Sequence, residues 1–423
     1  MSDRKDLKIA VIGGGSTYTP ELLEGLIQRS HMLKIGEVAL EDIADKRLSS
    51  IGSFCSRKTE KAGAGFKIST TADLEEACAG ASFIIIQIRV GGQEARHFDE
   101  MLGKKNGLIG QETTGAGGFS KAWRTIPVVL YIAKMIEKVS PNAWIINFTN
   151  PSGIITETLL RFSKLKVVGL CNIPMELRMG IADHLNVDAD RVDLDYVGLN
   201  HLSWVRRITV DGVDITNMVI DALAGGYVPE NIPEVQYSAA FHSALRMIPS
   251  PYLRYFYMTG EMIREQENSE RTRAQEVMEI EKGLFEYYND AKNFQKPALL
   301  HKRGGAWYSR AAVNVIGALL REKRSVEIVN AKNSGAIPGI PDDSAVEIPS
   351  FLSKKGVKPR HAGEIEEGII GLMRQVKSYE RLTIEAAMNR DYDKALLALV
   401  NNPLVRTVDK AEAVLDEIRN YNI

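Results

Sequence analysis

The sequence predicts an α/β fold in which a Rossmann-type parallel-sheet domain is followed by an α+β domain. Three observations support this prediction. A short apolar strand leads into a glycine turn and a helix at residues 8–29. Strands and helices then alternate up to about residue 170, and antiparallel strands and long helices follow from about residue 190. We therefore expect domains at residues 1–170 and 171–423.

The N-terminal domain begins with a strand–turn–helix unit. Lys8–Ile12 is apolar and strand-sized, Gly13-Gly14-Gly15 makes a turn, and Pro20–Arg29 has helical spacing. Thr19 can cap this helix, with Pro20 in its first position. Further strands are predicted at Glu37–Leu40, Lys67–Ser69, Phe83–Ile88, Trp144–Phe148 and Lys166–Leu170, and helices at Asp45–Ala62, Asp73–Ala79 and roughly Trp123–Val139.

Polar residues follow the ends of these strands. Parallel-sheet enzymes bind their ligands at the carboxyl ends of the strands, so such residues are expected to converge on one site. The residues at or just past a predicted strand end are Gly13, Asp42, Arg89, Asn147, Asn150 and Cys171.

The pattern changes in the second half. Asp195–Gly198 and Val205–Val210 are predicted to be antiparallel strands. Long helices are predicted from Val235 to Ile248, from Glu270 to Asn289, and from Gly363 onward. Between them, Ser325–Val329 and Ala345–Ile348 flank a loop rich in Gly, Pro and Asp.

Composition excludes several classes of partner. The 53 Lys and Arg residues and 54 Asp and Glu residues nearly cancel, which gives no electrostatic reason to expect nucleic acid or an anionic membrane. No apolar run is long enough for a membrane span, and no secretory segment precedes the first strand. Three widely spaced cysteines imply no disulfide framework. A cytoplasmic protein is therefore expected.

The glycine turn predicts a dinucleotide site. Backbone amides in such a turn, together with the following helix N-terminus, bind a pyrophosphate. The fit to the usual three-glycine pattern is partial, because Tyr18 stands at the third position. Asp42, at the end of the second strand, would hold ribose hydroxyls and favours NAD over NADP. The alternative for Asp42 is a helix cap before Asp45.

Other residues are ambiguous when judged by the sequence pattern. Cys171 and His201 suit a divalent metal completed by substrate oxygens, or alternatively core packing and structural hydrogen bonds. Arg89 and Arg273 suit a phosphate or carboxylate, although Arg273 also fits a solvated helix face. Tyr252 lies in an aromatic segment that by itself indicates packing.

Taken together, nine segments resemble glycoside hydrolase family 4, the NAD- and metal-dependent glycosidases. The resemblance runs in order from residue 9 to about residue 350. Within that family, Cys-Asn at residues 171–172 resembles the branch that acts on 6-phospho-β-glucosides. The matching segments are Val11–Tyr18, Gln87–Gly92, Gly110–Thr113, Asn147–Pro151, Gly169–Asn172, Gly198–His201, Thr272–Val277, Asp342–Asp343 and Val346–Pro349.

The resemblance implies a role for each matching residue. Cys171 and His201 match the ligands of a divalent metal, usually Mn²⁺. Tyr252 matches the catalytic base, with Tyr255 and Tyr257 as alternatives if the alignment is shifted, and Asn172 is the second residue expected at the reacting sugar. The residues implied for NAD are Gly13, Gly14, Gly15, Ser16, Thr17, Asp42 and Asn147; those implied for the phosphorylated sugar are Arg89, Glu112, Asn150, Asn172 and Arg273.

The implied reaction explains why a glycosidase would need NAD. It comprises oxidation at C3 of the sugar by NAD, deprotonation at C2, elimination of the aglycone, addition of water and re-reduction. The resemblance also implies a homodimer or homotetramer. Two alternatives remain: an NAD-dependent 2-hydroxyacid dehydrogenase, which would need no metal and would pair His with Asp, and a non-catalytic NAD sensor.

Overall fold

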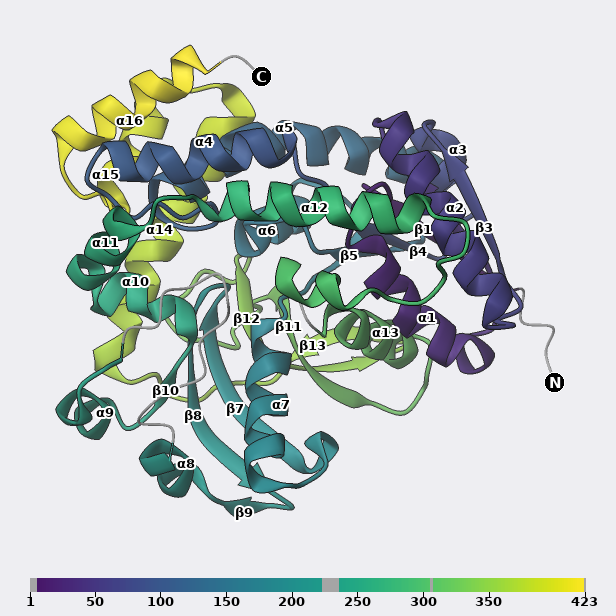
Figure 1. Cartoon of the computed structure of the whole chain (residues 1–423). Helices are drawn as coiled ribbons and strands as arrows, with labels where there is room; N and C mark the ends of the chain where they lie inside the picture. The colour runs from purple at the N-terminus through teal and green to yellow at the C-terminus, as the bar shows by residue number, and fades with distance from the viewer. Residues whose placement is uncertain (1–5, 223–235, 305–306, 422–423) are drawn as a thin grey trace.

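The computed structural model describes residues 6–222, 236–304 and 307–421, and it is built around a nine-stranded sheet (Figure 1). The strand order is β13-β12-β11-β6-β5-β4-β1-β2-β3, and β1 to β6 are parallel. This confirms the predicted Rossmann-type sheet. The parallel strands are β1 (Leu7–Ile12), β2 (Ile35–Glu41), β3 (Lys67–Thr71), β4 (Phe83–Ile86), β5 (Trp144–Asn147) and β6 (Lys166–Gly169).

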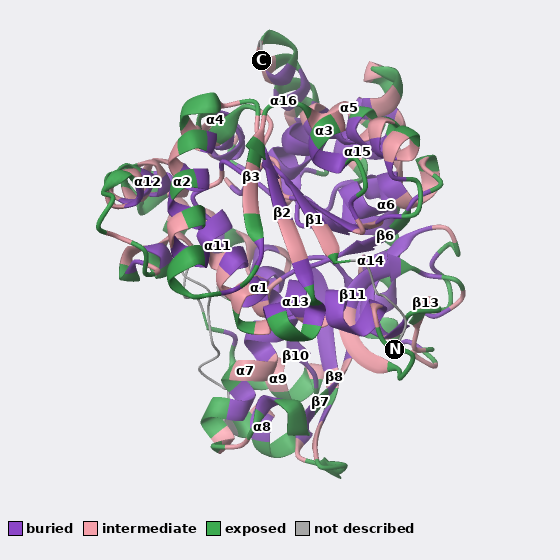
Figure 2. Cartoon of the chain, turned by 90° about the vertical axis from the view of Figure 1, so that its right-hand side faces the viewer, coloured by how far each residue is buried: buried purple, intermediate pink, exposed green. Residues whose placement is uncertain are grey.

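Helices cover both faces of the sheet, because its central strands are apolar on both sides. Helices α1 (Thr19–Leu33), α2 (Asp45–Lys61) and α13 (Tyr308–Leu319) pack against one face. Helices α3 (Leu74–Cys78), α5 (Gly115–Val139) and α6 (Ser152–Phe162) pack against the other. In Figure 2 the central strands of the sheet are largely buried, whereas the edge strand β3 is not.

Two local predictions are wrong at the helix starts. Tyr18, not Thr19, is the N-cap residue of α1, and the Thr19 hydroxyl instead donates to the Gly14 carbonyl at 2.8 Å. The helix expected from Trp123 begins at Gly115. An additional helix, α4 (Gly92–Lys105), follows the fourth strand in a region for which no helix was predicted.

Three strands from the C-terminal half extend the first sheet. They are β11 (Ser325–Lys332), β12 (Ala345–Ser353) and β13 (Gly356–Pro359), and they run antiparallel to one another. Strand β11 joins β6 with Asn330 opposite Gly169. The main sheet therefore crosses the predicted boundary at residue 170, and the division into 1–170 and 171–423 stays a prediction.

A second, antiparallel sheet lies below the first in Figure 1. It contains β7 (Val192–Leu199) and β8 (Leu202–Val210), which confirms the predicted antiparallel pair. The helix predicted from Val235 to Ile248 is wrong in its described part. Residue 235 lies outside the described residues, α9 covers only Ala239–Leu245, and a left-handed Arg246 ends it. The remaining elements of this region are α7 (Ile173–Leu185), η1 (Ala189–Arg191), β9 (Val213–Asp214), α8 (Thr216–Ala222) and β10 (Ile248–Pro249).

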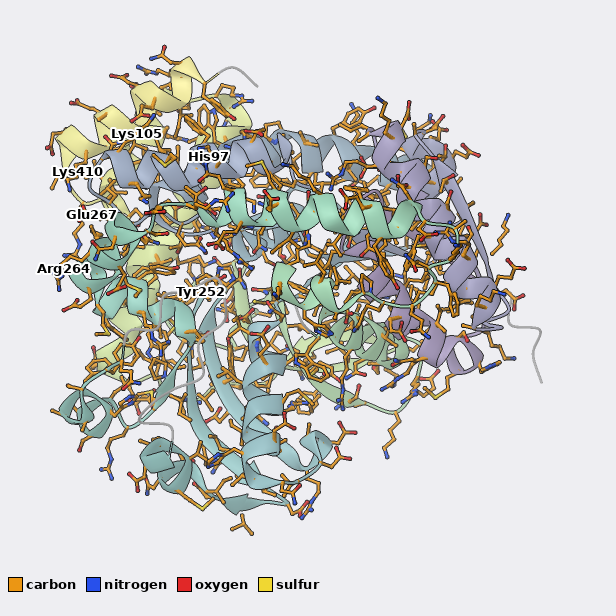
Figure 3. The ribbon with its side chains drawn as sticks, in the orientation of Figure 1. His97, Lys105, Tyr252, Arg264, Glu267 and Lys410 are labelled. Atoms are coloured by element: carbon orange, nitrogen blue, oxygen red, sulfur yellow. The ribbon has the colours of Figure 1, made fainter. Side chains whose placement is uncertain are left out.

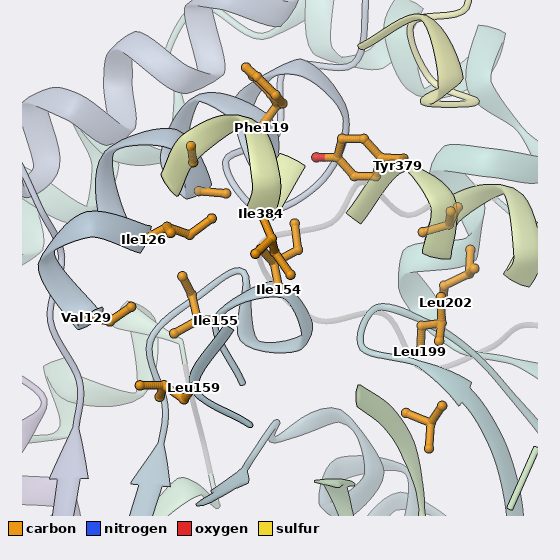
Figure 4. Packing of buried hydrophobic residues seen from close by; sticks show 14 of the residues in the cluster. Phe119, Ile126, Val129, Ile154, Ile155, Leu159, Leu199, Leu202, Tyr379 and Ile384 are labelled. Carbon is orange, nitrogen blue, oxygen red and sulfur yellow. The ribbon is translucent and has the colours of Figure 1, made fainter. Parts of the chain in front are cut away.

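The C-terminal helices complete the core. Helix α14 (Glu367–Asn389) packs its Tyr379 and Ile384 against α5 and α6 in the main hydrophobic cluster (Figure 4). None of the helices in the described residues is long and apolar enough to cross a membrane. The other helices are η2 (Pro251–Leu253), α10 (Arg254–Tyr257), α11 (Thr259–Asn268), α12 (Arg273–Asn289), η3 (Ala298–Arg303), α15 (Tyr392–Asn401) and α16 (Val408–Asn420).

Candidate active site

A cavity of about 1300 Å³ lies at the carboxyl ends of the parallel strands. It extends from the glycine turn after β1 to the turn that joins β7 to β8. Most residues predicted from the sequence line this one cavity, as expected for strand ends that meet at one edge of a sheet. Those that line it are Gly13, Ser16, Asp42, Arg89, Glu112, Asn150, Asn172, His201, Tyr252 and Arg273.

Five predicted residues do not line the cavity. Gly14 and Gly15 lie within the turn itself. Thr17 and Asn147 are fully buried. Cys171, which precedes Asn172 in the sequence, is also buried. The side-chain Nδ2 of Asn147 donates to the Thr149 carbonyl at 3.2 Å, and its Oδ1 accepts from the Thr149 backbone amide at 3.0 Å. Asn147 thus shapes the segment after β5, and direct contact with the cofactor remains only a prediction.

The glycine turn is held tightly against its neighbours. Gly13 has a φ of +84°, and a Cβ there would lie 2.9 Å from the Gln87 carbonyl oxygen, so a side chain does not fit. The Gly13 amide donates to the Glu41 carbonyl at 2.9 Å. Tyr18, which replaces the usual third glycine, is buried and packs edge-on against Tyr308 with ring centroids 5.8 Å apart.

Asp42 is bonded to the turn and also lines the cavity. Its Oδ2 accepts from the Gly15 amide at 2.9 Å, and its Oδ1 accepts from the Ala44 amide at 2.9 Å. Ala44 is the N-cap residue of α2. The carboxylate therefore orders both the glycine turn and the approach to α2, while its contact with a ribose stays a prediction.

The cavity carries opposite charges at its two ends. Near Asp42, the acids Glu41, Asp73 and Glu75 line it. Two large apolar side chains, Ile43 at 91% and Tyr131 at 61% exposure, also line this end, and a flat base bound there would cover them. Sequence reasoning missed them because single exposed hydrophobic residues carry no pattern.

The other end is rich in cations around the buried carboxylate of Glu112. Arg89 forms a bidentate ion pair with it, Arg96 Nε lies 3.2 Å from Oε1, and Lys121 Nζ lies 2.6 Å from Oε2. Burial alone would raise the pKa of Glu112, but these three cations hold that pKa well below its usual value.

Lys121 and Arg96 were not predicted from the sequence, since each lies within a helix and away from any strand end. Burial lowers the pKa of Lys121 to about 7, with Arg89 acting in the same direction and Glu112 opposing them. This end of the cavity therefore has a cation surplus that suits a phosphorylated ligand.

Arg273 is the first residue of α12, and it lines the cavity. Its guanidinium donates to Glu276 Oε2 at 2.7 Å and to the Lys302 carbonyl at 2.6 Å. Thr272 caps the helix through a reciprocal capping box with Gln275. His97 of α4, which is labelled in Figure 3, has its Nδ1 2.8 Å from the Thr272 hydroxyl and so links α4 to the start of α12. Arg273 thus lines the cavity, and its contact with a phosphate stays a prediction.

Glu281 of α12 is a further unpredicted residue of the site. It accepts from the Thr17 hydroxyl at 2.9 Å and from Arg47 at 3.2 Å, and Arg303 lies 3.3 Å away. Burial opposes ionisation, but Arg303 and Arg47 with the hydrogen bonds lower the pKa of Glu281 to about 2. This carboxylate joins the glycine turn to the opposite wall of the cavity.

Tyr252 and His201 lie face to face, with ring centroids 3.7 Å apart and planes inclined by 5°. Tyr252 lines the cavity near the centre of the view in Figure 3. Tyr255 is fully buried in the hydrophobic cluster that includes residues of β7 and β8. The Tyr257 hydroxyl accepts a hydrogen bond from Trp204 Nε1 at 3.2 Å. Of the three tyrosines, Tyr252 is the one placed to reach a ligand.

His201 occupies the tight turn between β7 and β8, with a φ of +64°. Its Nδ1 lies 3.2 Å from the Thr113 hydroxyl. Burial lowers the pKa of His201 to about 3, and Lys121 adds to this effect while Glu112 opposes it. The imidazole is thus neutral at physiological pH, the form that a metal ligand requires.

Cys171 lies two residues past the end of β6. Its Sγ is 3.9 Å from Asn172 Oδ1. Burial and then the Glu347 carboxylate raise the pKa of Cys171, whereas a hydrogen bond from the Asn200 side chain lowers it. Asn172 is the N-cap residue of α7, and its amide donates to Glu176.

The donor set fits a divalent metal that is completed by the substrate. In residues 6–222, 236–304 and 307–421, no group of three or more His, Cys, Asp and Glu side chains is placed to hold an ion. A thiolate and an imidazole supply two ligands, and the cavity beside His201 leaves room for ligand oxygens in the other positions. Cys171 and His201 are the residues that would hold it.

Comparison with known proteins identifies the family. Residues 8–187 match the model of the family 4 glycosyl hydrolases, and residues 196–405 match the model of the family 4 glycosyl hydrolase C-terminal domain. A Bacillus subtilis relative named "Probable 6-phospho-beta-glucosidase" is 46% identical, over 98% of this chain and 96% of its own. The 6-phospho-beta-glucosidase of Escherichia coli is 38% identical, over 97% of this chain and 94% of its own.

A solved structure is similar over nearly the whole chain. The 6-phospho-beta glucosidase from Thermotoga maritima, solved with manganese, NAD⁺ and glucose-6-phosphate, superposes with a TM-score of 0.92. It is 40% identical, and the match covers 98% of each chain. This chain therefore belongs to the family 4 glycosyl hydrolases.

Proposed function

We propose that this chain hydrolyses 6-phospho-β-glucosides, such as phosphorylated cellobiose or aryl glucosides, with NAD and a divalent metal, Mn²⁺, as cofactors. The observation that carries the proposal is the single cavity that joins a glycine turn and an acidic end to a cation-rich end. The stacked pair His201–Tyr252 stands at the cation-rich end. The 6-phospho-β-glucosidases named above support the same substrate class.

The acidic end and the glycine turn would hold NAD. The turn after β1 leads into the N-terminus of α1, and a helix N-terminus stabilises a pyrophosphate. Asp42 beside it would accept from ribose hydroxyls and repel a 2′-phosphate, which favours NAD over NADP. Ser16 lines the cavity at this point and would contact the cofactor's phosphates.

The cationic end would hold the phosphorylated sugar. Arg89 and Arg273 are assigned to the phosphate, because a guanidinium binds it in a bidentate manner. Glu112, held ionised by its cations, is assigned to sugar hydroxyls along with Asn150 and Asn172. The ion pair between Arg89 and Glu112 orients both side chains before the substrate arrives.

Tyr252 is assigned to the proton at C2 of the sugar. When bound, NAD⁺ accepts hydride from C3 and the metal acts as a Lewis acid on the neighbouring oxygens, which together make the C2 proton acidic enough to remove. His201 fixes the Tyr252 ring by stacking and stays neutral through burial. Asn172, the N-cap residue of α7, lines the cavity and is assigned to the reacting sugar.

The 2-hydroxyacid dehydrogenase alternative is not favoured. A dehydrogenase of that kind would pair its histidine with a carboxylate. The side-chain partner described for the His201 ring nitrogen is the Thr113 hydroxyl, and its aromatic neighbour is Tyr252. The relatives at 38–46% identity are named as glucosidases.

One assay tests the proposed function. The purified chain is incubated with p-nitrophenyl 6-phospho-β-glucoside and a reductant, with and without NAD⁺ and Mn²⁺. We expect release of p-nitrophenol only when both cofactors are present, with no accumulating absorbance of NADH. NADH that accumulates with a 2-hydroxyacid would support the dehydrogenase. Intact NAD binding with no hydrolysis would support the sensor.

The proposal extends to the cell and to assembly. A cytoplasmic location is supported by three free, buried cysteines and by a phosphorylated substrate, whose charge prevents passive passage through a membrane. The family resemblance supports a homodimer or homotetramer, which light scattering of the purified protein measures. No nucleic-acid or membrane partner is part of the proposal.

A further inference from the structure

Glu347 is a buried carboxylate near the predicted metal ligands Cys171 and His201. No step of the reaction described above uses it. Glu347 is on β12, is 1% exposed and does not line the cavity. The donors described for it are all uncharged. Its Oε2 accepts from the Tyr196 hydroxyl at 2.7 Å, and its Oε1 accepts from Asn200 Nδ2 at 3.1 Å and from Asn330 Nδ2 at 3.0 Å.

Burying a carboxylate among neutral donors is costly, so its presence calls for a physical reason. Burial raises the pKa of Glu347 to about 7, although the hydrogen bonds from Tyr196, Asn200 and Asn330 lower it. In its ionised form the carboxylate is acceptor-only, so each of its donors must point an N–H or O–H inward. A glutamine would present its own N–H group to one of these donors. Glu347 is thus able to fix the orientation of the Asn200 amide in a way that an uncharged residue of the same shape cannot.

Asn200 connects Glu347 to the site. Its Nδ2 donates to Glu347, and its Oδ1 accepts from the Gly153 amide at 3.4 Å. Its side chain also lies close enough to Cys171 to lower the pKa of that thiol. Asn200 also immediately precedes His201 in the turn between β7 and β8. The orientation of one amide therefore affects both predicted metal ligands.

We propose that Glu347 is a positioning residue that holds Asn200 in the orientation that directs the Cys171 sulfur and the His201 turn toward a shared metal ion. The proposal rests on the proposed function, because it assumes a metal at Cys171 and His201. In protein metal sites, residues that hydrogen-bond to the ligands set the ligands' orientation. Loss of those residues weakens metal binding.

Tyr196 provides a matched control. Its hydroxyl donates to the same carboxylate, through Oε2, and lies 2.5 Å from the Ser203 hydroxyl. It has no described hydrogen bond to Asn200. Tyr196→Phe therefore removes a donor from Glu347 in the same buried environment, while the hydrogen bond between Glu347 and Asn200 is retained.

The experiment measures Mn²⁺ binding by calorimetry in the presence of NAD⁺, together with the thiolate-to-metal absorption band of the Co²⁺-loaded protein. Glu347→Gln is expected to raise the Mn²⁺ dissociation constant about 10- to 100-fold and to shift or weaken the Co²⁺ band. Asn200→Ala should have the same effect. The double variant, which combines Glu347→Gln with Asn200→Ala, should bind Mn²⁺ no more weakly than either single variant. Each change breaks the same link between these two side chains.

The outcomes separate the two proposals. Wild-type affinity and an unchanged Co²⁺ band in a folded Glu347→Gln protein, or in Asn200→Ala if the former does not fold, would overturn the positioning role. Equal weakening by Tyr196→Phe would overturn it as well, because any disturbance of the network would then suffice. A wild-type protein that binds neither Mn²⁺ nor Co²⁺ would instead refute the metal site of the proposed function.

Discussion

The rings of His201 and Tyr252 are stacked almost in parallel, 3.7 Å apart between centroids. The two residues come from different elements, the turn between β7 and β8 and the 3₁₀ helix η2. This contact links a predicted metal ligand to the predicted base. A proton acceptor held against a metal ligand is positioned to remove a proton from the carbon next to a metal-bound oxygen.

Replacing Tyr252 by Phe should retain the stack but remove the proton acceptor. We expect kcat to fall by about 10²- to 10⁴-fold while the dissociation constant for NAD⁺ stays at its wild-type value. Steady-state kinetics and NAD⁺ titration measure the two quantities. Tyr257→Phe, whose hydroxyl accepts from Trp204, is the control and should keep its activity. Near-normal turnover of Tyr252→Phe would remove Tyr252 from the reaction.

Replacing Cys171 by Ser should weaken the metal site and the activity together, because a serine hydroxyl stays protonated and lacks the negative charge with which a thiolate binds a divalent cation. Activity is titrated against Mn²⁺ concentration for the wild type and the variant. Cys78→Ser, which alters a buried thiol on α3, is the control for loss of a cysteine. An unchanged Mn²⁺ requirement and rate in Cys171→Ser would show that the thiol is not a ligand.

Replacing Arg273 by Gln should impair recognition of the phosphate specifically. We expect kcat/KM for the 6-phosphorylated substrate to fall at least about tenfold, the effect of losing one charge-assisted hydrogen bond of 1.5–3 kcal/mol. Arg271→Gln is the control, since that side chain is 57% exposed and pairs with Glu279. Equal losses in both variants would contradict a phosphate contact at Arg273.

Glu281 should make stability depend on pH in the acid range. Its folded pKa is about 2 against an ordinary value of 4.5, so it contributes stability above pH 4.5 that is lost as the pH falls toward 2. The pKa difference corresponds to roughly 3 kcal/mol at about 1.4 kcal/mol per unit. Glu281→Gln should therefore unfold more easily in urea at pH 7.

The pH dependence identifies the cause of that destabilisation. The difference between wild type and Glu281→Gln should shrink as the pH is lowered from 4.5 toward 2, because the wild-type carboxylate becomes protonated. Glu279→Gln, on the same helix with a 63% exposed side chain, should show little change at any pH. A difference that stays constant with pH would mean that packing, not charge, is responsible.

The sequence predicted those parts of the site that depend on strand ends. Gly13, Asp42, Arg89 and Asn150 all line the cavity because parallel strands end at the same edge. Asn147 shows the limit of this reasoning. It is the last residue of β5, yet its side chain is turned inward, where Thr156 accepts a hydrogen bond from it at 3.1 Å.

Residues within helices were beyond the reach of such reasoning. Lys121 and Arg96 lie on α5 and α4, and they reach the site only because those helices pack against its rim. A buried lysine in a helix has no distinctive spacing in the sequence. Its significance comes from Glu112, which is nine residues earlier and 2.6 Å away.

The full extent of the main sheet also could not be predicted from local sequence patterns. Ser325–Val329 and Ala345–Ile348 were identified from the sequence only as segments that flank a loop, and their place in the main sheet was not predicted. They attach to β6 through the pairing of Asn330 with Gly169, residues separated by 161 positions. Pairing over that distance depends on tertiary packing, since any exposed edge of a sheet offers the same backbone groups.

The most direct test of the account is the fate of the C2 hydrogen of the sugar. The chain is incubated with a 6-phospho-β-glucoside, NAD⁺ and Mn²⁺ in D₂O, and the glucose 6-phosphate formed is analysed by NMR. If Tyr252 removes the C2 proton, that proton exchanges with solvent and the product carries deuterium at C2. A product that retains hydrogen at C2 would contradict the account and would indicate direct displacement at C1.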